Sequence, residues 1–112
     1  MPTEAVVLDR AFQALADPNR RQIVARLSKG SASVSELAQP LLISLPAVQQ
    51  HLDVLRKSGL VSSEKVGRVR TCRLEAEPMR SVERWIERHR TEWESRLDRL
   101  GDVLKDNPEE DG

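Results

Sequence analysis

The chain has 112 residues, of which 38% are hydrophobic and 32% are charged, and its 18 basic residues balance its 18 acidic ones. This composition is typical of one soluble globular domain with a modest core. Residues 1–9 lack the basic start and apolar run of a signal peptide, and no stretch approaches the roughly 20 apolar residues of a spanning helix. The single cysteine excludes an internal disulfide, so we expect a cytoplasmic protein without a membrane partner.

The neutral total hides an uneven distribution of charge. Between Asp17 and Leu74 there are ten basic and four acidic side chains, so this middle segment carries +6 and the flanks carry −6. A basic centre suits a module that binds phosphates, because neutralising them releases counterions. A run of charges is more often only a solvated face, so charge alone does not assign a function.

The first predicted helix runs from about residue 4 to residue 16. Its apolar residues recur at the three-and-four spacing of an amphipathic helix, and the stripe comprises Val7 or Leu8, Ala11, Phe12 and Leu15. The helix is expected to stop before Asp17, which can cap the next helix, while Pro18 takes that helix's first position.

The second predicted helix combines an apolar face with a basic coat. Its buried side is expected to consist of Ile23, Val24 and Leu27, and Gly30 is the expected terminator. Its ends and outer face are left to Arg20, Arg21 and Arg26.

Two further helices joined by a turn are predicted between residues 33 and 58. Ser33 and Glu36 have the spacing of a capping box, although Ser35 could equally be the cap, and Pro40 keeps this helix short. The next helix, residues 44–58, has Ser44 as its cap and ends at Gly59. At 100° per residue, its core face comprises Leu45, Val48, Leu52 and Leu55.

A β-hairpin is predicted over residues 60–74. Residues 60–66 and 69–74 alternate and contain β-branched residues, and Gly67 lies at the turn between them. Cys72 and Leu74 share a parity and are expected to face the core, whereas the arginines near Gly67 project from the tip.

One long helix is predicted over residues 78–105. Its apolar stripe, Met79, Val82, Ile86, His89, Trp93, Leu97, Leu100 and Leu104, is too long for a small domain to cover. We therefore expect a helix–helix seam between two copies of the chain, joined by the first helix. The predicted dimer interface comprises Leu8, Phe12, Val82, Ile86, His89, Trp93, Leu97 and Leu100. Residues 107–112 are acidic, contain a proline, lack apolar residues, and are expected to form a disordered tail.

This order of elements predicts a mainly α fold with a small β-hairpin, a winged helix-turn-helix with N- and C-terminal dimerisation helices. The expected domain covers residues 1–106, with a DNA-binding core at 17–74 and dimerisation helices at about 4–16 and 78–105. Small or polar residues at the start of helix 44–58 would let it enter the major groove of DNA. Arginines of the hairpin, residues 60–74, would follow the DNA backbone or the minor groove. The candidate DNA-binding residues are Ser44, Pro46, Ala47, Gln49, Gln50, His51, Lys57, Arg68 and Arg70.

Several motifs in this register resemble the ArsR-type winged helix-turn-helix repressors. They are the run from Ala14 to Arg21 with Ile23, residues 35–38, residues 44–48 with 51–55, and residues 58–61 before Gly67 and Arg68. The similarity covers about residues 12–74. It implies a homodimeric repressor of imperfect palindromes near its own promoter, in a family whose members often release DNA when a metal or another signal binds.

At two metal sites that are known in that family, this sequence departs from the metal sensors. Where those proteins often carry a cysteine pair, this chain has residues 36–39, which contain no thiolate for a soft metal. His89 and Glu92 match half of a second family site, but its upstream partner pair is missing at residues 76–78. We therefore expect no bound metal or cofactor and interpret His89 as an interface residue, and the effector stays unknown. Asp53 replaces a usual basic residue and is expected to pair with Lys57.

Other interpretations are weaker. No nucleophile, base and orienting group come together, and there is no glycine-rich phosphate loop, so the sequence does not predict an enzyme. Cys72 could be a redox switch but is more simply a core residue. Trp85 and Trp93 could line an effector pocket but more simply fill the helix seam. His51 is evenly balanced between contacting the groove and packing at the helix boundary. The alternative function is a protein-interaction module that docks through the long helix.

Overall fold

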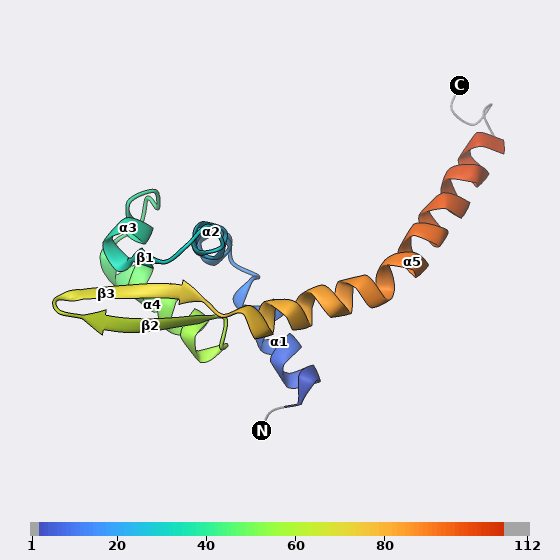
Figure 1. Cartoon of the computed structure of the whole chain (residues 1–112). Coiled ribbons are helices and arrows are strands. Elements are labelled where there is room, and N and C mark those ends of the chain that lie inside the picture. The colour runs from blue at the N-terminus through green and yellow to red at the C-terminus, as the bar shows by residue number, and fades with distance from the viewer. Residues whose placement is uncertain (1–2, 107–112) are drawn as a thin grey trace. The chain divides into compact units, whose positions relative to one another are not determined.

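The computed structural model describes residues 3–106, which form two compact units divided after Val82. The first unit contains α1 (Glu4–Ala14), α2 (Pro18–Leu27), β1 (Ala32–Ser33), α3 (Val34–Ala38), α4 (Leu45–Lys57), β2 (Val61–Val66) and β3 (Val69–Leu74). Helix α5 (Ala76–Asp106) begins in the first unit and provides the described part of the second. Figure 1 shows the elements in chain order.

The helices of the first unit begin where side chains satisfy their unpaired N–H groups. Asp17 caps α2 by accepting from the backbone N–H of Asn19 and Arg20 at 2.8 and 3.1 Å. Ser33 and Glu36 form the complete capping box of α3, so Ser33 and not Ser35 is the cap. Ser44 caps α4 through the N–H of Ala47. The predicted starts are confirmed, whereas α1 ends two residues earlier than predicted.

The core of the first unit lies between the helices and the sheet. Ile23, Leu37, Val48, Leu55 and Leu60 are among its fully buried side chains. The predicted apolar face of α4 is confirmed except at Leu45, which is 51% exposed. Leu45 is the first residue of α4. It is on the core-facing side of the helix axis, but it lies beyond the last layer of core side chains.

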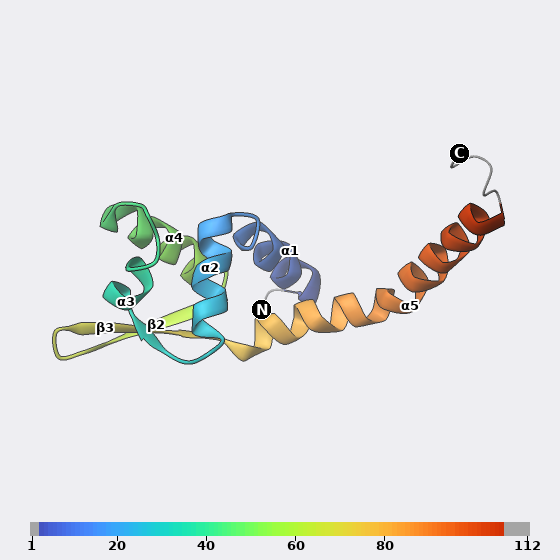
Figure 2. The same ribbon diagram turned by 90° about the horizontal axis from the view of Figure 1, so that it is seen from above.

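The sheet has three antiparallel strands in the order β1-β3-β2. The hairpin and its turn are confirmed, with Val66 opposite Val69, and its tip projects past the helices in both Figure 1 and Figure 2. The sequence prediction missed β1, whose Ala32 pairs with Cys72. Two residues are too few to show an alternating pattern, so only tertiary pairing defines this strand.

The second unit consists of one helical segment with an apolar stripe. Ile86, Trp93, Leu97, Leu100 and Leu104 are 36–65% exposed. The aromatic rings of Trp85, His89 and Trp93 follow one another along the helix, with centroids 4.4 Å apart for the first pair and 6.1 Å for the second. This stripe has the predicted spacing.

The predicted tail, residues 107–112, lies outside the described residues, and the predicted single domain over 1–106 stays a prediction. Among the helices of residues 3–106, none combines the length and the apolar character that crossing a bilayer demands.

The turn after α4 depends on a glycine. Gly59 has φ +85°, and a Cβ built there would meet its nearest neighbour, Pro78 Cγ, at an ordinary 3.9 Å. The left-handed backbone therefore disfavours a side chain more than the available space does. We expect Gly59→Ala to lower the free energy of unfolding by about 1–2 kcal/mol, and Gly59→Asn to lower it by about half as much, because Asn tolerates this conformation. Urea unfolding measures both, and equal losses would contradict the backbone explanation.

Candidate nucleic-acid interface

The N-terminal half of α4 presents an exposed surface of small and polar side chains. Pro46, Gln49 and Gln50 are exposed, Ala47 is half-buried, and the capping residue Ser44 is exposed beside them. Val48 and Leu52 point to the opposite side and are buried. The core thus fixes which face of α4 is available, and the first turn of α4 contains no acidic residue.

The hairpin tip carries basic side chains on a tight turn. Gly67 has φ +63° while Arg68 keeps a negative φ, which matches a two-residue II′ turn with glycine first. The exposed strand ends flanking it carry Lys65 and Arg70. Arg70 Nη1 donates to Ser63 Oγ on the neighbouring strand at 3.0 Å, so its guanidinium is held on the hairpin.

A groove lies between the helices α3 and α4 and the hairpin. It has a volume of about 440 Å³, and its lining includes Ser35 of α3, Leu45 of α4, and Lys65, Arg68 and Arg70 of the hairpin. Gln49 also lines this groove, although its neighbour Gln50 does not. The structure therefore brings Gln49 and the basic hairpin residues together.

Asp53 holds two basic side chains near the C-terminal end of α4. Its carboxylate oxygens lie 2.9 Å from Lys57 Nζ and 2.6 Å from Arg56 Nη2. Hydrogen bonds from Lys57 and Arg56 keep the pKa of Asp53 below its ordinary value. The predicted Asp53–Lys57 pair is confirmed, and Arg56 shares it. Because this carboxylate offsets the charge of Lys57, it also reduces the attraction of Lys57 for a phosphate.

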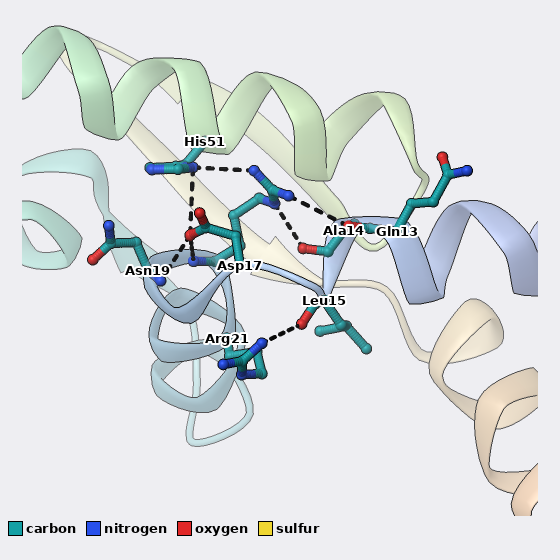
Figure 3. Close-up of polar contacts among 8 residues, drawn as sticks. Gln13, Ala14, Leu15, Asp17, Asn19, Arg21 and His51 are labelled. Atoms are coloured by element: carbon teal, nitrogen blue, oxygen red, sulfur yellow. Dashed lines mark hydrogen bonds and ion pairs between the residues drawn. The ribbon is translucent and has the colours of Figure 1, made fainter.

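His51 lies in a polar cluster where α1, α2 and α4 meet (Figure 3). Its Nδ1 is 3.3 Å from Arg20 Nη1 and 3.9 Å from Asp17 Oδ1. Neither of the two interpretations of His51, contact with the DNA groove or packing at the helix boundary, included this cluster. Its partners Arg20 and Asp17 are 31 and 34 positions away in the sequence.

The two adjacent arginines of α2 bind the end of α1. Arg20 donates to the carbonyls of Ala14 and Gln13, at 2.7 and 3.3 Å, and Arg21 donates to the carbonyl of Leu15 at 2.8 Å. Figure 3 shows these bonds converging on the turn before α2. The basic coat predicted for α2 is therefore partly engaged in capping α1, and fewer N–H groups of these two arginines can donate to a phosphate.

Cys72 is a core residue. Its side chain is buried, with 2% exposure, and pairing with β1 covers its strand. Burial raises the pKa of the thiol, which the positive charges of Arg70 and Arg56 oppose only in part. A protonated, buried thiol is a poor nucleophile, in agreement with the structural interpretation.

The predicted interface residues differ in their exposure. Leu8 and Val82 are already buried in the single chain, whereas Phe12, Ile86, Trp93, Leu97 and Leu100 are 36–65% exposed. His89 is half-buried, and its Nδ1 lies 2.8 Å from the carbonyl oxygen of Trp85. No group of three or more histidine, cysteine or carboxylate side chains with a metal-holding arrangement occurs within the described part of the chain.

The ionisation of Asp17 makes the stability of the fold depend on pH. Hydrogen bonds from the backbone N–H of Arg20 and Asn19, together with the charges of protonated His51 and of Arg20, lower the pKa of Asp17 below its ordinary value. A carboxylate of this kind stabilises the fold above its ordinary pKa, and this contribution is lost as the pH falls through the lower, folded-state value. Asp17→Asn keeps a capping oxygen but cannot ionise.

We therefore expect the stability difference between the wild type and Asp17→Asn to shrink as the pH falls below the ordinary pKa of an aspartate and through the lower, folded-state pKa of Asp17. Urea unfolding at a series of pH values measures it, and Asp9→Asn, on the exposed side of α1, serves as the control. A difference that stays constant down to the acid limit would contradict the role of the Asp17 charge.

Comparisons with known proteins agree with this geometry. Residues 17–63 match the family model described as bacterial regulatory protein, arsR family. The chain is 51% identical over 67 residues to the HTH-type transcriptional regulator Rv2034 of Mycobacterium tuberculosis, a match covering 60% of this chain and 63% of that protein. It is 30% identical over 60 residues to the transcriptional repressor SdpR of Bacillus subtilis, covering 54% of this chain and 67% of that protein.

Solved structures extend the similarity beyond the helix-turn-helix. The crystal structure of the ArsR family transcriptional regulator RHA00566 has a TM-score of 0.73 and 46% sequence identity, and the match covers 85% of this chain and 98% of that one. The transcriptional repressor BigR from Xylella fastidiosa has a TM-score of 0.61 and 32% identity, covering 75% and 87%.

Proposed function

This chain belongs to the ArsR family of bacterial regulatory proteins, and we propose that it acts as a homodimeric repressor that binds an imperfect palindromic operator, including one at its own promoter. The family consists of transcriptional regulators and not of enzymes. The observation that carries the proposal is the polar, exposed start of α4 beside the basic hairpin, with a groove that both of them line.

In this proposal α4 is the recognition helix. Its small side chains, Ser44, Pro46 and Ala47, allow close approach to base edges in a major groove about 12 Å wide. Gln50 would read adenine through its N6 and N7 edge, and Gln49 would contact a base or phosphate from the groove side. His51 and Lys57 would lie near the DNA backbone.

The hairpin is the wing. Arg68 at the turn and Arg70 on β3 would follow the phosphates or enter the adjacent minor groove, whose negative potential attracts arginine. Arg70 is already positioned by Ser63, which reduces the entropy lost when it binds.

Dimerisation would place two recognition helices about one helical turn of DNA apart. The exposed stripe Ile86, Trp93, Leu97 and Leu100 provides apolar surface that a second copy would cover. Phe12 of α1 is also exposed in the first unit. A cytoplasmic location, where DNA is accessible and the Cys72 thiol stays reduced, belongs to the same proposal.

The proposal is tested by fluorescence anisotropy of the purified chain with duplex DNA from upstream of its own gene and with a scrambled duplex, at low and moderate salt. We expect preferential binding to the upstream duplex, an affinity that falls steeply with salt, and two chains per site. Equal, salt-independent responses would instead favour a protein partner docking on α5.

Two variants separate reading of bases from phosphate contacts. Gln50→Ala is expected to lose about 1–3 kcal/mol of discrimination at one position of each half-site and little affinity for random DNA. Arg68→Ala is expected to weaken binding to all duplexes similarly and to reduce the salt slope by about 1. Titrations of cognate, single-base-changed and random duplexes measure both effects, and equal losses on cognate and random DNA for Gln50→Ala would exclude its proposed role.

A charged residue in the exposed stripe tests the dimer. Leu97 is 65% exposed, and Leu97→Glu would place a charge in the seam, so we expect the dimer dissociation constant to rise more than about tenfold. Leu42→Glu is the matched control, because Leu42 is fully exposed outside the helices. Sedimentation equilibrium measures both, and an unchanged constant for Leu97→Glu would show that the seam lies elsewhere.

A further inference from the structure

Arg20 bridges two helices that the proposed function uses differently. Its Nε and Nη2 donate to the carbonyls of Ala14 and Gln13 at the end of α1, and its Nη1 faces Nδ1 of His51 on α4 (Figure 3). One planar guanidinium thus spans from the proposed dimerisation helix α1 to the recognition helix α4.

The chemistry of Arg20 determines which nitrogen of His51 carries a proton. Guanidinium N–H groups only donate, so Nδ1 must accept from Arg20 Nη1, and in the neutral ring the proton lies on Nε2. Asp17 Oδ1, at 3.9 Å, is beyond hydrogen-bond distance of Nδ1 and already accepts from two backbone N–H groups. Arg20 therefore outweighs Asp17 in selecting the tautomer.

We propose that Arg20 is a positioning residue that locks His51 in its Nε2–H tautomer and so fixes the donor that α4 presents to the DNA backbone, while tying that helix to the end of α1. Only the part of this proposal that concerns the DNA backbone rests on the proposed function. The tautomer and the link between α1 and α4 are properties of the free protein.

A fixed His51 ring would suit the binding of a DNA phosphate. A phosphate oxygen accepts hydrogen bonds, so the Nε2–H of a fixed, half-buried ring is a useful donor. Holding the ring before DNA arrives reduces the entropy lost on binding. Because the same guanidinium holds the end of α1, a shift of α1 would be transmitted to His51 and to the recognition helix.

The second histidine provides an internal reference. His89 Nδ1 lies 2.8 Å from the carbonyl oxygen of Trp85, and a carbonyl only accepts, so here Nδ1 carries the proton. The chain has two histidines, and the structure assigns them opposite tautomers.

The first arm of the test is a long-range ¹H–¹⁵N spectrum of the free wild-type chain at alkaline pH, where both rings are neutral. We expect Nε2–H for His51 and Nδ1–H for His89. In Arg20→Lys we expect His51 to populate the Nδ1–H form, because Asp17 then competes for the ring. An Nδ1–H tautomer for wild-type His51 would overturn the proposal, whatever the DNA measurements show.

The second arm compares two substitutions that keep the charge. Lysine cannot reproduce a planar fork that binds α1 and His51 at once. We expect Arg20→Lys to weaken binding to the upstream duplex about tenfold, the scale of one hydrogen bond to a charged group, with the salt slope unchanged. Arg21→Lys is the matched control, since Arg21 caps the same helix through Leu15 without contacting His51, and we expect a change of less than about twofold.

A cycle with His51→Ala separates positioning from general stability. In the His51→Ala background, Arg20→Lys should change affinity by less than about twofold, because the partner through which it acts is gone. Equal losses in both backgrounds, or equal losses for Arg20→Lys and Arg21→Lys, would overturn the proposal. If the wild type did not prefer the upstream duplex, the proposed function would fail, while the spectrum would still decide the Arg20–His51 link.

Discussion

The turn between α1 and α2 is the constraint on which the rest of the structure depends. Within a few residues, Asp17 caps α2, while Arg20 and Arg21 bind three successive carbonyls at the end of α1. A helix end left without partners would lose several hydrogen bonds, so these contacts hold α1 and α2 at a fixed angle. His51 adds α4 to the same cluster. The orientation of the recognition helix is thus set by polar contacts as well as by the core beneath it.

The wing depends on a different constraint. A two-stranded hairpin alone is only marginally stable, and here β1 and the buried Cys72 attach its base to the helices. Towards Gly67 the strands are exposed on both faces, which leaves the basic tip projecting beyond the core. The base of the hairpin therefore provides stability and its tip provides charge, so substitutions at the tip can alter DNA contacts without destabilising the fold.

Local signals in the sequence predict much of this architecture. Caps such as Asp17 and Ser44, the capping box at Ser33 and the glycine turn at Gly67 act within four residues, so their effects can be read directly. Long-range features could not be predicted in this way. Strand β1 exists only through its pairing with β3, and Leu45 has a core-facing angle but lies past the end of the core. The Arg20–His51 contact joins residues 31 positions apart. No local sequence pattern indicates that Arg20 binds groups of its own chain instead of DNA.

Hydroxyl-radical footprinting of the full chain on duplex DNA from upstream of its own gene tests the central claim most directly. A symmetric pair of recognition helices, each followed by a wing, predicts two protected segments whose centres lie about one helical turn, roughly 10 base pairs, apart and are related by a twofold axis. A single protected segment, or uniform weak protection along the duplex, would contradict the account of a dimer that reads a palindrome.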